Sequence, residues 1–569
     1  MRTLVIQLGR LGDVIQTTPL LHDLATTRVG GRTDLLLLDP NQDAILGIQG
    51  VATVRTIGER LKPLDDQIAT GFRRGRIPPE AAQLLEQLEL PRYDRVINTS
   101  HAALGCWLTA QISAAEREGG VITREGECLY EGPAQIYRVA MLGFREQNWF
   151  NIVDLMRCAA HPGHTTTGSG SRHAEAGPNP VWATFARDSQ LYLKAAAHLP
   201  FALPGGPIVA LNVGASEKRR RWPAEHFARL AEGLIAHGLV PILVGAPSDL
   251  DACDQVQTSG PMALPNFAGK TSIQQMALLL AKSALLVSAD TGAAHMAAAM
   301  DTKVVGLFAS SAYFAETSPW GRGHSILQTR IGASMSTLLP DTVLAAVLHR
   351  LGRVDTLTLQ RELANRQQAA WETDFLPPGS DPLGGLCYHP LHGRPHTIEH
   401  LFTRSLRHVL ARKFCRGRRN APSGYLADSA AGARDAGLGA DGCEFLRNAN
   451  FLAHILEQMQ GAAAACAEMT ARRDAGIGAI ATKLTNELEG LKGLTEKNPW
   501  AMFRPVVHYL DWTLRMMPIL PPKDTFLAHA DEYRGATTLL RETTSLVNGF
   551  LVPHDDAAHL PEGLTTIEA

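Results

Sequence analysis

The feature that most constrains the fold is an alternation of short apolar segments with helix-length segments, joined by turns that contain glycine. Residues 3–8 form a compact apolar run, residues 9–12 contain two glycines, and residues 13–25 carry apolar side chains at helical spacing. This order predicts a buried strand, a turn and a helix. An apolar run at residues 35–38 repeats the strand signal, and a third strand signal appears at residues 95–98. Alternation of this kind is typical of a parallel sheet.

A second set of the same kind follows after a change in composition. Residues 161–180 are rich in Gly, Ser, Thr, Pro and His, which bury little apolar surface, and we interpret them as a linker. The expected elements of the second set are strands at residues 208–211, 240–244, 285–287 and 304–308 and helices at residues 223–237, 272–281 and from Gly292 onward. The sequence therefore predicts the α/β fold class with two tandem Rossmann-like domains, at residues 1–165 and 181–352.

After the second domain the strand signals stop. We expect a mainly helical C-terminal extension over residues 353–569, because apolar side chains keep helical spacing at residues 446–459 and 477–491. Further apolar segments follow around residues 506–517 and 539–550. The extension contains no catalytic pattern, and the sequence does not indicate its role.

Charge and hydropathy exclude some classes of protein. The 569 residues include 54 Lys and Arg against 56 Asp and Glu, and a formal charge of -2 gives no overall positive field to recruit nucleic acid. No apolar run reaches the roughly 18 residues that a membrane span needs, and the N-terminal run is too short for a signal peptide. We therefore expect a cytoplasmic protein.

The cysteines are widely spaced along the chain. The nearest two, Cys106 and Cys128, are 22 positions apart, so no short-spaced zinc site or redox pair is encoded. We expect reduced thiols.

The first candidate for chemistry is the turn after the first predicted strand. Gly9 and Gly12 let the backbone pass close to a ligand, with Arg10 between them, and Asp13 begins the following helix. A carboxylate there can take a proton from an attacking hydroxyl as a general base. The alternative is that Asp13 only complements the helix dipole, which stabilises a helix by about 0.3–1 kcal/mol.

The second candidate is the turn Asp290-Thr291-Gly292-Ala293-Ala294-His295, which follows a predicted strand and opens a helix. Free backbone amides and the helix dipole favour an anion such as a pyrophosphate at this point. Thr291 and His295 can donate further hydrogen bonds. In an open parallel sheet, ligands bind beyond the carboxyl ends of the strands, where this turn is expected. The alternative is an ordinary Asp or Thr helix cap.

The third candidate is a loop that begins at Asn212 and includes Ser216. Four consecutive cations follow, from Lys218 to Arg221, and Arg220 and Arg221 precede a Trp-Pro pair. A charge run is usually a solvated loop. At the same sheet edge as the Asp-Thr-Gly turn, however, a diphosphate is a natural counter-charge.

Together these segments resemble the heptosyltransferase family, glycosyltransferase family 9. Members of this family begin with a strand that leads into a Leu-Gly-Asp turn, and further motifs follow in order. The matching segments here are Gly214-Ala215-Ser216, Arg220-Arg221-Trp222-Pro223, Phe267-Ala268-Gly269-Lys270-Thr271, Asp290 to His295 and Pro319-Trp320-Gly321. The resemblance covers roughly residues 1–350.

The resemblance implies a GT-B type fold, with two facing Rossmann-like domains. The first would bind the acceptor and the second a nucleotide-activated sugar, with ADP-heptose as the expected donor. It implies no metal and no cofactor. By position, Asp13 matches the catalytic base, Ser216 matches a phosphate-contacting loop, and Gly9, Arg10 and Gly12 form the acceptor-side loop. The donor-diphosphate turn of the family corresponds to Asp290, Thr291, Gly292 and His295.

Two donor-side positions are less certain matches. Arg220 stands where many members have a phosphate-binding lysine, which keeps the charge but replaces a compact ammonium by a planar fork. Arg221 lies beside it in the same motif. Asp249 falls near the nucleotide-contacting segment and is a candidate ribose or base contact.

The function implied by the resemblance is inverting transfer of a heptose or similar sugar to a lipopolysaccharide core or related surface glycan. Asp13 would remove the acceptor proton while the cationic loop stabilises the departing nucleoside diphosphate. Peripheral contact with the inner face of the inner membrane is expected. Two alternatives stay open: transfer to a protein such as an adhesin or flagellin, and a non-catalytic scaffold that binds sugar nucleotides.

A separate histidine pair lies in the extension. His396 and His400 are four residues apart, a spacing that can bind zinc on one helix face. The alternative, which we favour, is a helix with solvated or packed histidines.

Overall fold

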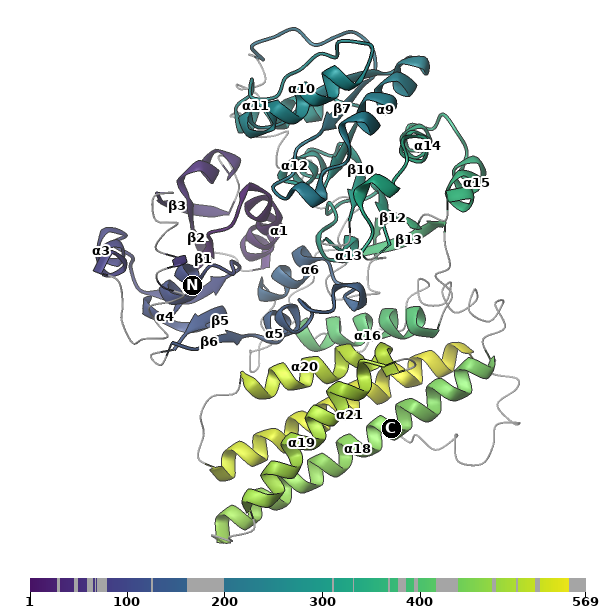
Figure 1. Cartoon of the computed structure of the whole chain (residues 1–569). Coiled ribbons are helices and arrows are strands. Elements are labelled where there is room, and N and C mark those ends of the chain that lie inside the picture. Colours follow the sequence, from purple (N-terminus) through teal and green to yellow (C-terminus); the bar gives the residue numbers. More distant parts are fainter. Residues whose placement is uncertain are drawn as a thin grey trace. The chain divides into compact units, whose positions relative to one another are not determined.

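The computed structural model (Figure 1) describes most of the chain, in two compact units. The described residues are 1–27, 31–45, 50–58, 65–66, 68, 79–123, 126–160, 199–309, 312–330, 332–366, 369–376, 385–392, 398–415, 439–472, 477–497, 500–516 and 522–551. The first unit comprises Met1–Gln135, Phe150–Pro378 and Leu383–Gly393, and the second comprises Ile136–Trp149, Gly379–Pro382 and Arg394–Ala569. The linker expected at residues 161–180 lies outside the described residues.

The first unit begins with a six-stranded sheet of order β3-β2-β1-β4-β5-β6. Its strands are β1 (Arg2–Gln7), β2 (Arg32–Leu38), β3 (Val51–Ile57), β4 (Tyr93–Asn98), β5 (Ala114–Ile122) and β6 (Cys128–Glu131). The first five are parallel, and β6 runs antiparallel to β5. The three strands expected here correspond to β1, β2 and β4, which confirms a Rossmann-like sheet.

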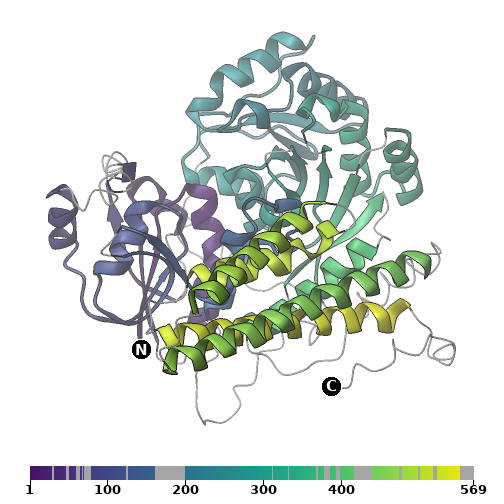
Figure 2. The ribbon, with the colours of Figure 1, turned by 60° about the horizontal axis from the view of Figure 1, so that its bottom comes forward.

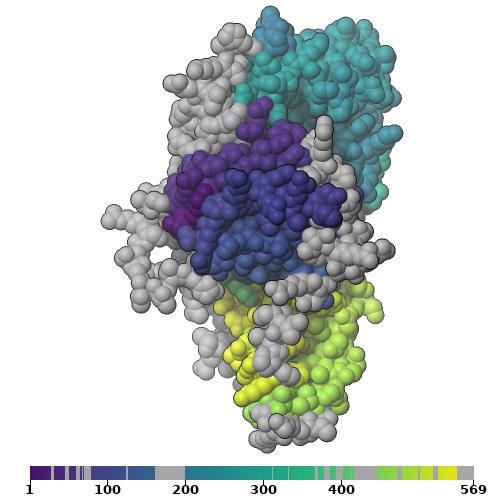
Figure 3. Space-filling view, turned by 90° about the vertical axis from the view of Figure 1, so that its left-hand side faces the viewer, coloured from purple at the N-terminus to yellow at the C-terminus, as the bar shows by residue number. Residues whose placement is uncertain are grey.

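Helices cover the first sheet. The part of the chain that contains this sheet is coloured purple and blue in Figure 3. Leu4, Ile6 and Val96 share one core with α3 (Pro79–Gln87) and α4 (Ala103–Gln111). The other described helical segments of this region are α1 (Leu11–Thr27), η1 (Asp39–Ile45), α5 (Pro133–Ala140), η4 (Arg145–Gln147), α6 (Ile152–Arg157) and η5 (Cys158–Ala160). Because β1 and β2 are largely buried, their sequences contain apolar runs.

A seven-stranded sheet of order β13-β12-β11-β10-β9-β7-β8 follows in the same unit. Its strands are β7 (Ile208–Asn212), β8 (Val240–Val244), β9 (Leu285–Ala289), β10 (Lys303–Phe308), β11 (Ser325–Gln328), β12 (Ala369–Phe375) and β13 (Leu386–His392). Strands β7 to β11 are parallel, and β12 is antiparallel to both of its neighbours. The four strands expected in this region are confirmed.

The expectation that strands stop at about residue 353 is wrong. Strands β12 and β13 lie beyond it and extend the second sheet. Neither strand reads as a continuous apolar run, because only Ala370 and Thr373 are buried in β12 and β13 carries Pro390 at an edge position. The hydroxyl of Tyr388 in β13 donates to the Ala315 carbonyl at 2.9 Å, which ties the added strand to the parallel part.

Two helical layers cover the second sheet. Val209, Leu211 and Val287 point to a core shared with α9 (Ala224–Ala236), α10 (Leu250–Ser259), α14 (Pro340–Arg350) and α15 (Thr356–Arg366). The alternate residues Ala210 and Leu286 pack with α11 (Ile273–Ala281) and α12 (Gly292–Ala299), and Ile15 of α1 joins this second core. Short helical segments of this region are η6 (Lys218–Arg220), η7 (Pro247–Asp249), α13 (Phe314–Thr317) and η8 (Met335–Thr337).

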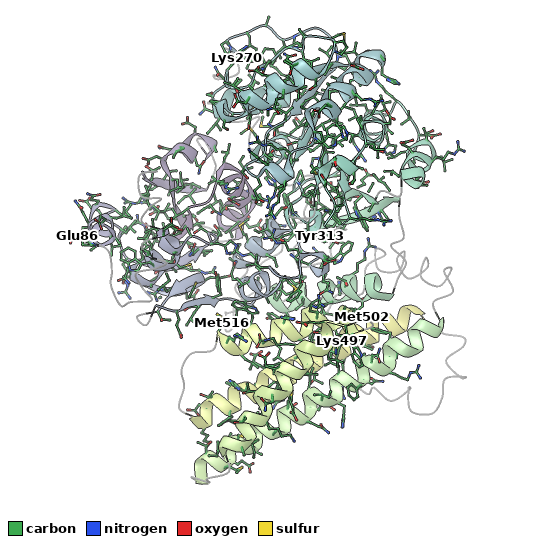
Figure 4. All side chains as sticks on the ribbon, viewed as in Figure 1. Glu86, Lys270, Tyr313, Lys497, Met502 and Met516 are labelled. Carbon is green, nitrogen blue, oxygen red and sulfur yellow. The ribbon has the colours of Figure 1, made fainter. Side chains whose placement is uncertain are left out.

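A short bridge extends the second sheet beside β8. Leu243 and Asn266 form an isolated parallel bridge. The Nζ of Lys270, labelled in Figure 4, donates to the Asn266 carbonyl at 2.8 Å and closes the following turn. The bridge places the Phe267–Thr271 motif directly after a strand position.

The second unit is helical, as expected for the extension. Its helices are α16 (Ile398–Cys415), α18 (Gly439–Arg472), α19 (Ile477–Thr495), η9 (Trp500–Phe503), α20 (Arg504–Arg515) and α21 (Pro522–Leu551). The long helices α18 and α21 lie side by side in both views (Figure 1 and Figure 2). No helix among the described residues combines the length and the apolar character needed to cross a membrane.

Residues 136–149, which the sequence analysis assigned to the first domain, belong to this helical unit. The ring of Tyr137 packs against Phe414 and Tyr509, with centroids 5.5 and 6.0 Å apart. The ring of Phe144 lies 4.2 Å from that of His508. Aromatic side chains that find their partners more than 250 positions away explain why this grouping is not visible in the local sequence.

We predict that Asp154 of α6 is essential for the stability of the first unit. This fully buried carboxylate accepts hydrogen bonds from the Trp320 indole and from the backbone amide of Leu386, each at 2.9 Å. Asp154→Ala leaves two buried donors unpaired and should lower the free energy of unfolding by about 3 kcal/mol in urea titrations. The exposed Asp254→Ala should change it by less than about 0.5 kcal/mol, and equal effects would contradict this assignment.

Candidate functional site

The candidate loops lie where strand order reverses in each sheet. In the first sheet this point is between β1 and β4, and the loop that follows β1 contains Gly9 and Arg10. In the second sheet it is between β7 and β9, which are followed by the Ser216 loop and by the Asp290 turn. Ligands of open parallel sheets bind in the crevice at such points.

The loop after β1 is folded back on its own side chains. Asp13, in the first turn of α1, accepts a hydrogen bond through Oδ2 from the backbone amide of Arg10 at 2.8 Å. A methyl group on Gly9 would lie 2.6 Å from that oxygen, so the loop requires glycine there. Gln7 Oε1 accepts from the Gly9 amide, and Asn41 Nδ2 donates to its carbonyl, both at 3.0 Å. Asp13 thus stabilises the loop after β1 through Oδ2, which accepts the hydrogen bond from the Arg10 amide.

The turn after β9 is held by hydroxyl and amide groups at the ends of buried strands. Thr291 Oγ1 donates to Asn212 Oδ1 at 3.1 Å, and Ser288 Oγ donates to the same oxygen at 3.2 Å. Asn212 Nδ2 in turn donates to the Val244 carbonyl at 3.2 Å. These bonds fix the start of α12, where the amides of Ala294 and His295 donate to the Thr291 carbonyl and those of Gly292 and Ala293 have no carbonyl one helical turn earlier. The hydroxyl of Thr291 therefore positions the turn.

Asp290 lies between two basic side chains. Its Oδ2 is 3.3 Å from Arg220 Nη1, and its Oδ1 is 3.7 Å from His295 Nε2. Arg220 also contacts Glu217, at 3.1 Å. The three sequence-predicted residues Asp290, Arg220 and His295 therefore form one cluster beside the first turn of α12.

The two glycine turns touch each other. A methyl group on Gly12 would lie 3.1 Å from Cδ2 of His295 and 3.3 Å from Cα of Gly292. His295 is only 7% exposed, and its Nδ1 has no hydrogen-bond partner among the described residues. A buried ring nitrogen in this state is the kind of group that a bound ligand satisfies.

A second contact joins the loop after β1 to another loop of the second sheet. Arg10, which is exposed, donates from Nη1 to Ser216 Oγ at 2.9 Å. This hydrogen bond links the loop after β1 to the loop after β7. It places the guanidinium of Arg10 beside the phosphate-contacting position expected for Ser216.

The remaining predicted residues stabilise loops. Arg221 Nε donates to the Ala215 carbonyl at 3.0 Å. Asp249 Oδ2 accepts from the Ala246 amide at 2.9 Å, and its carboxylate fills the space beside Gly214, where a methyl group would lie 2.0 Å from Oδ1. The described contacts therefore place Asp249 against the loop that carries Ser216.

Sequence reasoning gave no role to two residues of the site. Asn212 and Ser288 form the hydrogen bonds that hold Thr291, and both are buried. The available signal was a polar residue at the end of an otherwise apolar strand, where a buried polar group needs a partner.

The arrangement can bind an anion. The N-termini of α1 and α12 meet at Gly12 and Gly292, and both helix dipoles favour negative charge there. Arg10 and Arg220 supply two guanidinium groups. Within the described residues no three His, Cys, Asp or Glu side chains are grouped as metal ligands. His396 and the side chain of His400 lie outside that description.

We predict that Arg220 binds the anion and that its neighbour Arg219 does not. Arg220 is 18% exposed at the cluster, whereas Arg219 is 71% exposed and pairs with Glu217 at 2.6 Å. Calorimetric titration with pyrophosphate should show a Kd raised about tenfold or more by Arg220→Ala, because a charge-assisted hydrogen bond is lost. Arg219→Ala removes the same net charge and should leave the Kd within about twofold. Equal losses in both variants would mean that the loop acts only through its net charge.

Comparison with known proteins supports the motifs of the second sheet. Residues 178–342 match the family model of glycosyltransferase family 9 (heptosyltransferase). Lipopolysaccharide heptosyltransferase 2 of Salmonella typhimurium is 32% identical over 110 residues, which cover 18% of this chain and 32% of the relative. Lipooligosaccharide heptosyltransferase 2 of Haemophilus influenzae is 33% identical over 107 residues, covering 18% and 31%. The matched segment thus spans about a third of the length of these relatives.

Among solved structures, the ADP-heptose lipopolysaccharide heptosyltransferase II of Escherichia coli is 21% identical, with a TM-score of 0.43 over 64% of this chain and 99% of that chain. The match to the family model includes the Ser216 loop, the basic segment and the Asp290 turn. Residues 178–342 are therefore similar to glycosyltransferase family 9.

Proposed function

We propose that the chain is an inverting glycosyltransferase that transfers a heptose or similar sugar from a nucleotide-activated donor, with ADP-heptose as the donor. The observation that carries the proposal is the contact between the turn of Asp13 and the turn of Asp290 to His295. It joins a carboxylate that can act as a base to an anion site within one unit. The match of residues 178–342 to family 9 supports the same reaction class.

The donor half of the proposal rests on the α12 cluster. A sugar nucleotide carries two negative phosphates, and the first-turn amides of α12 with Arg220 provide donors for them. Arg10 Nη1 donates to Ser216 Oγ, in the loop that precedes Arg220. As the glycosidic bond breaks, negative charge develops on the leaving diphosphate, and these groups stabilise it.

The acceptor half rests on Asp13. Its Oδ2 is held by the Arg10 amide, which fixes the carboxylate at the start of α1 and leaves Oδ1 for a substrate. In a single displacement, the acceptor hydroxyl gives its proton to Asp13, and its oxygen forms a bond to the anomeric carbon. The bond from that carbon to the phosphate oxygen breaks, and the configuration inverts.

The acceptor we propose is a lipopolysaccharide core or a related surface glycan. The curated relatives are named as lipopolysaccharide and lipooligosaccharide heptosyltransferases, which supports a glycan over a protein acceptor. A lipid-linked acceptor also implies that the protein works at the cytoplasmic face of the inner membrane, through peripheral contact. No metal enters the proposed reaction.

The proposal predicts that Asp13→Asn abolishes transfer without abolishing donor binding. The amide can still accept from the Arg10 amide through its oxygen, so the loop is kept while the base is lost. We expect kcat to fall by about 10²–10⁴ fold, measured as ADP release from ADP-heptose with a heptose-deficient core acceptor. The Kd for ADP should stay within about twofold.

Asp249→Asn is the matched control, because Asp249 makes the same kind of bond, to the amide of Ala246. It should leave kcat at saturating donor unchanged. A normal kcat in Asp13→Asn would refute the assignment of the base. Transfer to an adhesin or flagellin instead of the glycan would show that the acceptor is a protein. If no sugar nucleotide raised the melting temperature in a thermal-shift panel, the scaffold alternative would be favoured.

A further inference from the structure

Two cysteines that are distant in sequence meet in the first sheet. Cys106 in α4 and Cys128 in β6 have their sulfur atoms 3.9 Å apart. Cys106 is 1% exposed, whereas Cys128 is exposed to solvent. The spacing of 22 residues gave no indication of this contact, which the structure forms between two reduced thiols.

The fold brings the pair together through β5. Cys128 is paired with Ile122 of β5, and α4 packs on the same strand. Gly120 of β5 has no side chain, and a methyl group there would lie 2.4 Å from Cys106 Sγ. The sulfur of Cys106 therefore occupies the space beside Gly120 that a larger residue would fill. From this position it contacts the sulfur of Cys128.

The chemistry of the two thiols differs. The hydrogen bond with the Cys106 thiol, opposed by partial burial and aided by Tyr130, lowers the pKa of Cys128 to about 7. A thiol of this pKa is substantially ionised at neutral pH, and the thiolate is the nucleophile in sulfur chemistry. By contrast, burial and the nearby Asp249 and Asp254 carboxylates raise the pKa of Cys253 to about 12.

We propose that Cys128 is a site of oxidation by hydroperoxides and that Cys106 is its resolving thiol. The proposal is independent of the transferase function. An exposed thiolate with a second thiol directly behind it is the arrangement in which a sulfenic acid condenses to a disulfide.

The reaction balances with hydrogen peroxide as the oxidant. The Cys128 thiolate attacks one peroxide oxygen, the O–O bond breaks, and hydroxide leaves and is protonated to water, which gives a sulfenic acid. The Cys106 sulfur then attacks the sulfenic sulfur, the S–O bond breaks, and a second water forms with the Cys106 proton. Two thiols lose two electrons in total, and one peroxide is reduced to two waters.

Formation of the disulfide would shift residues near the carboxyl edge of the first sheet, where the candidate substrate loops begin. The sulfurs must approach from 3.9 Å to about 2.05 Å, which moves Cys106 toward β6. Asn98 Nδ2 lies 3.7 Å from Cys106 Sγ, and Asn98 Oδ1 accepts from the amide of Ser100 at 3.0 Å. Asn98 ends β4, so the link is connected to the loop at the carboxyl end of that strand.

Peptide mapping of the full-length protein tests the proposal. The reduced protein is treated with equimolar hydrogen peroxide at high dilution, blocked with N-ethylmaleimide and digested with trypsin without reduction. We expect peptides 96–117 and 125–138 to appear as one linked species that has lost two hydrogen atoms and separates on reduction. Cys253 should be recovered as its maleimide adduct, because its high pKa keeps it protonated.

Two variants separate the roles. In the Cys128→Ser variant, Cys106 should react with maleimide only after the protein is unfolded, because Cys106 is buried. Cys106→Ala should halt the reaction at the Cys128 sulfenic acid, which dimedone traps. Recovery of Cys128 from treated wild-type protein as the maleimide adduct, or as the sulfinic acid without a linked peptide, would overturn the proposal, and this result does not depend on the folding of either variant.

Discussion

The approach of Gly12 to Gly292 and His295 is the contact on which the site depends. A methyl group on Gly12 would lie 3.1 Å from the His295 ring and 3.3 Å from the Gly292 backbone, which is tighter than an ordinary van der Waals contact, so glycine favours this close approach. The contact brings the N-termini of α1 and α12 together, and their partial positive charges act on one ligand position. The hydrogen bond from Arg10 to Ser216 links the same loop after β1 to the loop after β7. The candidate anion site therefore depends on the close approach of two glycine backbones.

A carboxylate folded back over a glycine occurs in both α/β regions. Asp13 accepts from the amide of Arg10, and Asp249 accepts from the amide of Ala246, each three residues earlier in the chain. The two loops have the same local chemistry, but they follow different strands. The Asp13 loop follows β1, at a reversal of strand order, whereas the Asp249 loop follows β8, one strand from the reversal beside β7. Place in the sheet, and not the local motif, distinguishes a candidate base from a loop cap.

The parts of the fold that the sequence predicts are those with local signals. Strands such as β1 and β9 are buried on both faces, so their apolar runs identify them, and glycine turns mark the loops beside them. The edge strands β12 and β13 lack such runs, and residues 136–149 join the helical unit through distant aromatic partners. The candidate residues around Asp290 could be named from sequence. The hydrogen bond between Thr291 and Asn212 could not, because it forms only when β7 pairs with β9.

A crystal structure with ADP bound tests the central claim most directly, because it locates the diphosphate. We expect phosphate oxygens within about 3 Å of the first-turn amides of α12 and of the Arg220 guanidinium, with His295 in contact. A diphosphate bound elsewhere, for example at the Asp249 loop with the first turn of α12 left open, would contradict it.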